Sequence, residues 1–363
     1  MYKAHYIVRP GWRHLGTGGL FLDISRPEPT SRRYDCQNEL VRCFGPGLAY
    51  RPAFRLELVM IVDAHTHIWQ SPEQLGDGAL AELSRPASVA GQRMRLLPQA
   101  DTANHLIAAE PVDRSIILGF RSRYLGAAIS NEYIASYCRE HADRMIGFAG
   151  IDPTEPTALE MLREGVEQLG LKGVTICPAA QDFHPCDTRA MAVYELAAAL
   201  RIPVVFYPGT HLSAKTKMEY ARPVLLDEVA RSFPHLKLVI SHFGYPWVDE
   251  AITLLGKHHN IYADVAALLR RGWVLYDALV RAHQFGVIDR LLFGSDFPFL
   301  NASEGIEIIY SVNHYTMGTN LPGIPREALR GIVERDTLQV LGIKVAPSRM
   351  VQLPRQRRVP KVG

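Results

Sequence analysis

The stretch MIVDAHTHIW at residues 60–69 marks the point where the sequence becomes regular. Its apolar start predicts a short buried strand, and two histidines follow directly. From here on, short apolar runs alternate with longer amphipathic stretches, which is the pattern of repeated β/α units. The expected strands cover residues 61–64, 115–120, 145–149, 171–177, 202–207, 236–241, 261–264 and 290–294.

The spacing of these strands favours a closed barrel. From the third strand onward, the starts recur every 25 to 34 residues, about one β/α unit each. The strands are apolar without alternation, which is typical of a parallel sheet buried on both faces. Between them lies at least one clear helical stripe, formed by Leu159, Leu162, Val166 and Leu169. Eight units within residues 60–343 predict a TIM-like (β/α)8 barrel. The alternative is a doubly wound open sheet, although no GxGxxG or GxxxxGK[ST] motif follows a strand.

The two ends of the chain differ from the expected barrel. Residues 1–59 are interrupted by Pro and Gly and carry a net charge of +4, so we expect a loop-rich extension. Residues 344–363 form a basic tail of net charge +6 without an acidic residue. The barrel segment, residues 60–343, is therefore acidic at −7, although the whole chain is +3. One hypothesis is that Met60 is the biological start and that the extension is an upstream reading-frame addition.

Composition excludes several classes of protein. Hydrophobic residues make up 47% and charged residues 21% of the chain, as in ordinary globular proteins. No apolar run approaches the roughly 18 residues of a membrane helix. The small net charge argues against nucleic-acid binding. Five cysteines without a CxxC pair, and the lack of a signal-peptide pattern, predict a cytoplasmic protein with reduced thiols.

Two histidines, His65 and His67, stand at the end of the first expected strand. Side chains two residues apart on a strand point to the same face, so both imidazoles should project into the mouth of the barrel. Imidazole binds Zn²⁺ and several other divalent ions. The pair is therefore a candidate metal site, and the alternative is two loop histidines without a shared role.

Two further candidates follow the eighth and sixth strands. Asp296 in LLFGSDFP ends the eighth strand, where it could bind a metal ion and accept a proton from bound water; the alternative is a turn aspartate. Closure of a barrel makes the first and eighth strands neighbours and would bring Asp296 to His65 and His67. His242 in LVISHFG ends the sixth strand and is a candidate general acid or base, or a group that orients a substrate carbonyl; the alternative is a structural histidine.

These segments resemble the amidohydrolase-related branch of the amidohydrolase superfamily, which includes aminocarboxymuconate-semialdehyde decarboxylase. The resemblance extends over about residues 60–343. It implies a TIM-like barrel with one metal ion at its C-terminal mouth, bound by His65, His67 and Asp296, and it implies His242 as the catalytic acid or base. The motifs that carry it are MIVDAHTHIW, YARPVLLDEVA, ISHFGYPWVDEAI, NIYADVA and LLFGSDFP.

The chain departs from the family pattern at the fifth strand. Family members usually carry a third metal-binding histidine there, whereas IPVVFYPGTH places Tyr207 at that position. A neutral tyrosine, with an ordinary pKa of about 10, is a poor ligand. His211 could substitute from the following loop, or it could be a plain surface residue. Thr175 stands near the position of a lysine found in some members, which favours a mononuclear site over a lysine-bridged binuclear one.

Three functions are consistent with these residues. The main prediction is a metal-dependent hydrolase, in which Asp296 takes a proton from metal-bound water as it attacks a carbonyl carbon. The first alternative is non-oxidative decarboxylation of a small aromatic or unsaturated carboxylic acid, with Arg222 holding the carboxylate; Arg222 could also be a surface charge at a helix end. The second alternative is a non-catalytic ligand-binding barrel, which Tyr207 would favour.

The expected cofactor is one divalent metal ion, Zn²⁺ ahead of Mn²⁺. The expected partner is a small-molecule substrate, and the resemblance implies a homodimer.

Overall fold

One parallel sheet of eight strands lies at the centre of the molecule. The computed structural model describes residues 60–76, 87–89, 92–94, 100–209 and 213–345, all within the unit Val59–Gly363. Every expected strand is present; most are shorter than the apolar runs suggested, the strand at 261–264 has the expected bounds, and the first and third are one residue longer. In sheet order the strands are β1 (Val62–Thr66), β4 (Arg114–Leu118), β7 (Met145–Gly150), β8 (Val174–Ile176), β9 (Val204–Phe206), β10 (Leu238–Ile240), β11 (Ile261–Asp264) and β12 (Leu291–Leu292).

The segment after β12 returns to β1. The backbone N–H of Ala64 donates to the carbonyl of Phe293 at 2.9 Å, and that of Asp296 donates to the carbonyl of His65 at 3.0 Å. An isolated parallel bridge joins Thr66 to Phe297. The eight-stranded sheet thereby comes round on itself, and the predicted TIM-like barrel is confirmed.

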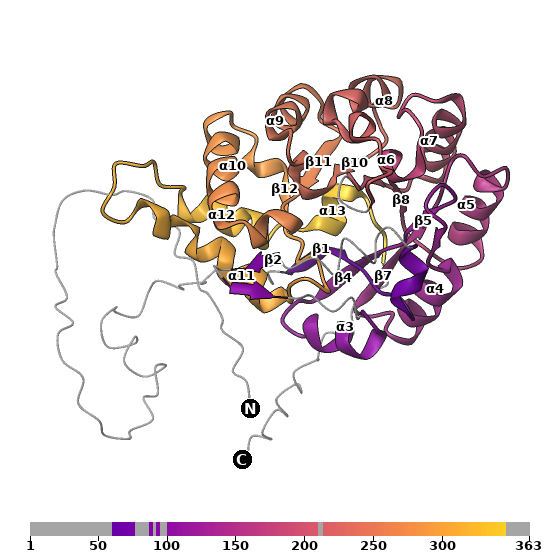
Figure 1. Ribbon diagram of the computed structural model, residues 1–363, viewed down its shortest axis with the longest axis horizontal. Coiled ribbons are helices and arrows are strands. Elements are labelled where there is room, and N and C mark those ends of the chain that lie inside the picture. The colour runs from indigo at the N-terminus through magenta and orange to yellow at the C-terminus, as the bar shows by residue number, and fades with distance from the viewer. Residues whose placement is uncertain (1–59, 77–86, 90–91, 95–99, 210–212, 346–363) are drawn as a thin grey trace, which may run out of the picture. The chain divides into compact units, whose positions relative to one another are not determined.

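Helices surround this sheet, as Figure 1 shows for α4, α5, α7, α8, α9 and α10. Most connect consecutive strands, as the β/α pattern requires. Their bounds are α3 (Thr102–Ala108), α4 (Asn131–Glu140), α5 (Ala158–Glu167), α6 (Pro178–Gln181), α7 (Thr188–Leu200), α8 (Asp227–Ser232), α9 (Val248–Lys257), α10 (Gly272–Gln284), α11 (Ala302–Ser311), α12 (Arg326–Val333) and α13 (Thr337–Leu341). None of the described helices is long and apolar enough to cross a membrane.

Shorter elements lie in the connections. Two antiparallel pairs join β2 (Ala87–Val89) to β3 (Gln92–Met94) and β5 (Arg121–Ser122) to β6 (Ala127–Ala128). The 3-10 turns are η1 (Pro72–Leu75), η2 (Met218–Ala221), η3 (Pro223–Leu226), η4 (Ser241–Gly244), η5 (Ala266–Arg270), η6 (Ile288–Arg290) and η7 (Val312–Thr316). Two of them, η4 and η5, follow β10 and β11 directly and supply site residues.

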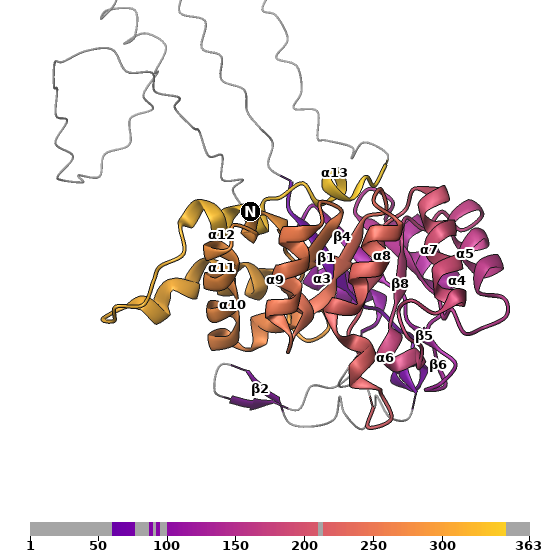
Figure 2. The same cartoon turned by 90° about the horizontal axis from the view of Figure 1, so that it is seen from above.

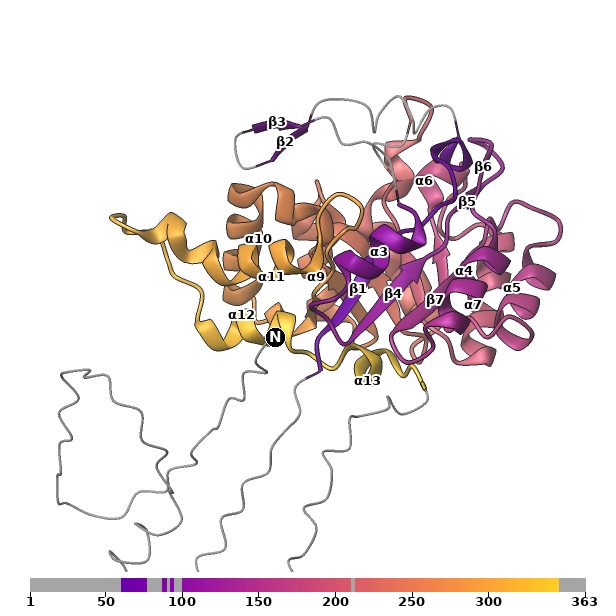
Figure 3. The same cartoon turned by 90° about the horizontal axis from the view of Figure 1, so that it is seen from below.

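The two ends of the barrel are built differently. Inside the barrel, strand side chains such as Ile116, Phe148 and Leu292 form an apolar cluster that also includes Leu338 and Leu341 of α13. Figures 2 and 3 show α13 at one end of the strands and α6, β5 and β6 at the other. Helix α13 therefore closes the N-terminal end of the barrel, and the C-terminal end is left for the site residues.

Only some of the residues in the predicted apolar stripe of α5 are buried. Leu162 is fully buried between the helix and the sheet, whereas Leu159 is 42% exposed. Leu159 lies in the first turn of α5 and is not among the buried residues of this helix, which are Ala158, Leu162 and Gly165. The expectation that Leu159 shares the buried face is wrong.

This difference within one helix gives a stability prediction. Leu162→Ala should lower the free energy of unfolding by about 2–5 kcal/mol, because it leaves a cavity in the core. Leu159→Ala removes the same atoms from a partly solvated position and should cost less than about 1 kcal/mol. Urea unfolding followed by circular dichroism measures both values, and equal costs would contradict the described packing of α5.

Candidate metal centre

His65 and His67 lie together at the C-terminal end of β1, as their spacing predicts. Their Nε2 atoms are 3.0 Å apart, and their exposed fractions are 0% and 8%. Gly294 of the returning segment makes this placement possible, because a Cβ atom there would lie 2.6 Å from the Cβ of His65. Close approach of the eighth strand to the first thus depends on a residue without a side chain.

The outer nitrogens of both rings have acceptor partners. Nδ1 of His65 lies 2.9 Å from Oδ2 of Asp264, and Nδ1 of His67 lies 3.3 Å from the carbonyl of Leu118. A carboxylate and a carbonyl can only accept, so each Nδ1 must carry the hydrogen. A neutral ring then has a lone pair on Nε2, and the two lone pairs face each other. This arrangement requires a shared positive charge, either a proton or a metal ion.

The surrounding charges act differently on the two rings. Burial works to lower the pKa of His65, but the Asp264 carboxylate outweighs it, with help from Asp296 and Asp63, and raises that pKa above its ordinary value. Burial and the neighbouring charge of His65 lower the pKa of His67 to about 3. At neutral pH, His67 is therefore neutral, and its Nε2 lone pair can accept a hydrogen bond from His65 or bind a metal ion.

Asp296 lies beside this pair. Its Oδ1 atom is 3.7 Å from Nε2 of His65 and 3.6 Å from Nε2 of His242. Its Oδ2 atom accepts a hydrogen bond from Arg270 at 2.9 Å. Burial acts to raise the pKa of Asp296, but the Arg270 guanidinium and the nearby imidazoles hold it well below its usual range. Asp296 is therefore a carboxylate.

His242 reaches the site through an unusual turn after β10. His242, Phe243 and Gly244 all have positive φ angles, of 56°, 48° and 65°. The backbone N–H of His242 donates to Oδ1 of Asp264 at 2.9 Å, which holds the turn against β11. The imidazole of His242 is 4.8 Å from that of His65 between ring centroids, and burial lowers its pKa.

Asp264 connects these groups and was not singled out from the sequence. One oxygen accepts from the ring of His65, and the other accepts from the backbone N–H groups of His242 and Ala266. Asp63 acts similarly on the other side, where it accepts from the N–H of Ser295 at 2.9 Å. A signal was available, because Asp264 ends an apolar strand in the same way as Asp296.

Tyr207 occupies the place expected at the end of β9. Its ring centroid is 5.7 Å from that of His65, 5.6 Å from that of His67 and 5.0 Å from that of His242. Burial raises its pKa well above the ordinary value, so the phenol is neutral. It contributes a wall to the site and no anionic ligand. His211, the candidate substitute, lies outside the described residues.

The residues present suit a metal ion. One ligand atom from each of His65, His67 and Asp296 lies within 4.8 Å of the others. Two buried polar atoms beside them, Oδ1 of Asp296 and Nε2 of His242, have no hydrogen-bond partner among the described residues. A second group of His65, His242 and Asp264 meets the same distance limit, but its contact is the hydrogen bond on Nδ1 of His65. The first group is the better donor set.

Two arginines near the C-terminal mouth of the barrel, Arg222 and Arg270, differ in their contacts. Arg222, predicted to bind a substrate carboxylate, is about half exposed and pairs with Glu250 at 2.9 Å. With Tyr207 it lines a cavity of about 20 Å³, and its substrate role stays a prediction. Arg270 was missed from the sequence, although its guanidinium contacts Asp296 and lies 4.3 Å over the ring of Phe299.

A model of the amidohydrolase family matches residues 62–334. The chain belongs to the amidohydrolase family. This confirms the resemblance read from the motifs, and the family and fold support an enzyme that uses a divalent metal ion. No functionally curated protein sequence matches the chain.

Three solved structures illustrate what the amidohydrolase barrel is similar to, and at these identities they show the fold alone. The probable 2-pyrone-4,6-dicarboxylic acid hydrolase of Acinetobacter baumannii is 14% identical, with a TM-score of 0.54 over 78% of this chain and 99% of that one. The 5-carboxyvanillate decarboxylase LigW of Sphingomonas paucimobilis is 14% identical, with a TM-score of 0.54 over 79% and 100%. LigW2 of Novosphingobium aromaticivorans, another 5-carboxyvanillate decarboxylase solved with bound manganese, is 12% identical, with a TM-score of 0.57 over 78% and 97%.

The Asp264–His65 contact gives a prediction for metal affinity. Asp264→Asn removes the acceptor-only partner that fixes the hydrogen on Nδ1 of His65. Loss of such a partner typically weakens metal binding by about 10–100-fold. Titration of chelator-treated protein with Zn²⁺ or Mn²⁺ measures the change. Asp143→Asn, at an exposed position, is the control and should bind as wild type. Unchanged affinity in Asp264→Asn would contradict the role given to Asp264.

His105, behind the site, gives a prediction for pH. Thr66 donates to the carbonyl of Ile116 at 2.8 Å, so its hydroxyl oxygen accepts from Nε2 of His105 at 2.9 Å, and Nδ1 of His105 accepts from Tyr137 at 2.8 Å. Burial lowers the pKa of His105 to about 3. Between about pH 6.5 and pH 3, His105 is therefore protonated in the unfolded chain and neutral in the folded one.

Stability should accordingly fall as pH drops from about 6.5 towards 3, by up to about 1.4 kcal/mol per pH unit from this residue. His105→Gln keeps hydrogen-bonding groups without the titration, so its free energy of unfolding should fall less steeply over this range. Urea unfolding at several pH values compares the two proteins. Parallel curves would show that His105 does not stay neutral in the folded protein.

Proposed function

We propose that this amidohydrolase catalyses the non-oxidative decarboxylation of a small aromatic or unsaturated carboxylic acid. This was the first alternative drawn from the sequence, and it now stands ahead of hydrolysis. The observation that carries it is the contact of Arg270 with Asp296 inside the histidine cluster. Arg270 is a fixed cation with several donors, and it lies where an anionic substrate would approach the metal ligands. The two decarboxylases of similar fold support the same reaction class.

The walls beside the histidines suit the body of such a substrate. A cavity of about 40 Å³ next to His67 and Tyr207 is otherwise lined mainly by apolar groups, Trp69, Leu75, Gly119, Phe120, Ile129, Thr175 and Phe299. Flat aromatic side chains pack well against an aromatic ring. We therefore infer that the ring lies against this wall and that its carboxylate faces the arginine and the metal ligands.

The reaction replaces a C–C bond by a C–H bond. The bond between the ring carbon and the carboxylate breaks, carbon dioxide leaves, and the electron pair left on the carbon takes a proton. Nε2 of His242 lies 3.6 Å from Oδ1 of Asp296 and has no hydrogen-bond partner among the described residues, so this imidazole is suited to carry that proton. Arg270 fixes the orientation of Asp296 through its other oxygen.

His65, His67 and Asp296 would hold the metal ion. When bound, it would act as a Lewis acid on an oxygen atom of the substrate. Two imidazoles and a carboxylate accept either Zn²⁺ or Mn²⁺. Zn²⁺ was the first expectation from the sequence, and the manganese-bound decarboxylase of similar fold favours Mn²⁺, which we propose here.

Metal-dependent hydrolysis is the second candidate function. The same ligands could activate water, and a probable hydrolase shares the fold. The two reactions differ in product, because only decarboxylation releases carbon dioxide. A non-catalytic barrel, the third possibility raised by Tyr207, predicts neither product.

Metal content and product analysis test the proposal together. Purified wild-type protein should contain about one divalent ion per chain by elemental analysis, and His65→Ala should lose it. With Mn²⁺ or Zn²⁺ supplied, wild type should release carbon dioxide from at least one member of a panel of hydroxybenzoates and unsaturated acids. Arg139→Ala, at an exposed site on α4, controls for preparation. Hydrolysis of lactones without carbon dioxide release would favour the second candidate. Wild-type protein without bound metal would refute the metal centre, and metal loss in His65→Ala with unchanged activity would refute a catalytic role for the ion.

A further inference from the structure

A large cavity among the described residues lies away from the metal centre. It has a volume of about 820 Å³, within the range of small-molecule binding sites. Its lining comes from the segments that precede β8, β9 and β10 and from Leu341–Lys344 at the end of α13. Since the metal centre is built at the C-terminal ends of the strands, this cavity belongs to the opposite end of the barrel.

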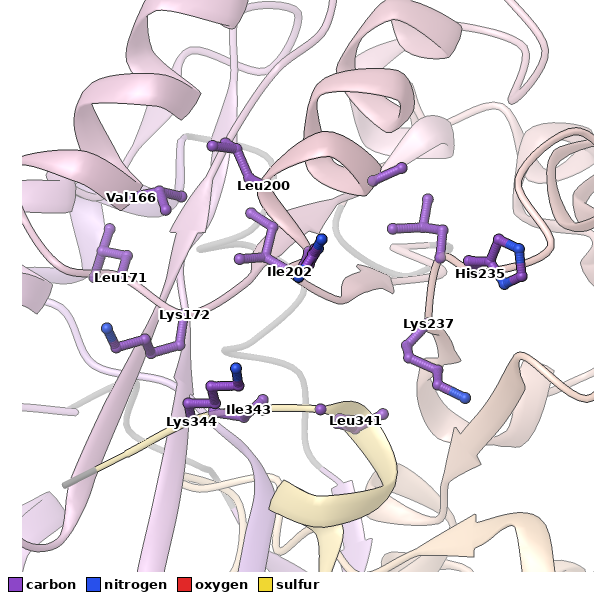
Figure 4. Close-up of a pocket in the computed structure, with 14 residues that line it drawn as sticks. Val166, Leu171, Lys172, Leu200, Ile202, His235, Lys237, Leu341, Ile343 and Lys344 are labelled. Carbon is purple, nitrogen blue, oxygen red and sulfur yellow. The ribbon is translucent and has the colours of Figure 1, made fainter. Parts of the chain in front are cut away.

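The walls of the cavity are apolar. Leu171, Leu236 and Leu341 are 1–3% exposed, and Ile202 and Ile343 are 7% and 8% exposed. Figure 4 shows Leu200 and Ile202 on one side of the space and Leu341 and Ile343 on the other. An apolar body of aromatic or acyl type would be dehydrated on entering, which favours binding.

The rim of the cavity is positively charged. Lys172, Arg201, Lys237 and Lys344 belong to its lining, and no aspartate or glutamate is among the described lining residues. None of these four cations forms an ion pair within the described part of the chain. In Figure 4, the side chain of Lys344 extends towards the middle of the space, and Lys172 and Lys237 stand at its edge.

The described lining of this cavity offers no compensating negative charge. The residues that follow Lys344, up to Gly363, include five further basic residues and no acidic one. Like charge therefore argues against the tail as the occupant. An uncompensated cationic rim around an apolar space matches a ligand with the opposite charge and an apolar body.

We propose that this cavity is a second binding site, which takes a small organic anion with an aromatic or acyl body and a phosphate, sulfonate or carboxylate group. The apolar walls receive the body, and the four cations receive the charged group. The site is independent of the metal centre and of the reaction proposed for it.

Calorimetric titration with 1-naphthyl phosphate tests this directly. Wild type should bind one equivalent, and affinity should fall as salt rises from about 0.05 M to about 0.5 M, because the attraction is electrostatic. Inorganic phosphate alone should bind at least about tenfold more weakly, because it lacks the apolar body. Equal binding of phosphate and naphthyl phosphate would overturn the apolar part of the proposal.

Four variants locate the binding. Arg201→Glu and Lys344→Glu each reverse one rim charge and should weaken binding by about tenfold or more. Arg139→Glu makes the same change on the exposed face of α4 and should bind as wild type. His65→Ala should also bind as wild type, since the metal centre lies elsewhere. Loss of binding in His65→Ala, or equal binding in all three Glu variants, would overturn the proposal. Circular dichroism confirms that each variant is folded.

Discussion

The buried hydrogen bond between Asp264 and His65 is the interaction on which the site depends. It joins side chains 199 positions apart and fixes which nitrogen of His65 carries its hydrogen. The same carboxylate holds the backbone turn that presents His242. Burial of the Asp264 carboxylate would be costly by itself. The contacts with His65 and His242 offset this cost, so the carboxylate stays charged and holds both residues in place. Without it, the ring of His65 would lose its Nδ1 partner, and the turn that carries His242 would lose a backbone contact.

Charge balance then explains why the cluster needs a further cation. Asp264 and Asp296 are both buried carboxylates, and Arg270 contacts only one of them. The Nε2 atoms of His65 and His67 lie 3.0 Å apart, which is a spacing that two nitrogens bound to one ion at about 2.0–2.1 Å can adopt. Tyr207 stays neutral and adds no negative charge. The donor set is therefore smaller than the family pattern but chemically consistent with one divalent ion.

Much of this arrangement could be predicted from the sequence, because a barrel places the C-terminal ends of all its strands at the same end of the fold. Recurrence of apolar runs gave the fold, and polar residues directly after them gave His65, His67, His242 and Asp296. Applied to NIYADVA, the same rule would also have found Asp264. Arg270 could not be found this way, because it reaches Asp296 only through the 3-10 turn after β11. The cavity at the opposite end likewise depends on the return of the chain after α13, which strand periodicity does not encode.

The central claim is that His65 and His67 share a metal ion with Asp296. Anomalous diffraction from crystals grown with Mn²⁺, recorded on both sides of the manganese absorption edge, locates such an ion directly. The account predicts one strong peak bounded by Nε2 of His65, Nε2 of His67 and a carboxylate oxygen of Asp296. Data from such crystals without an anomalous peak between the two rings would contradict it.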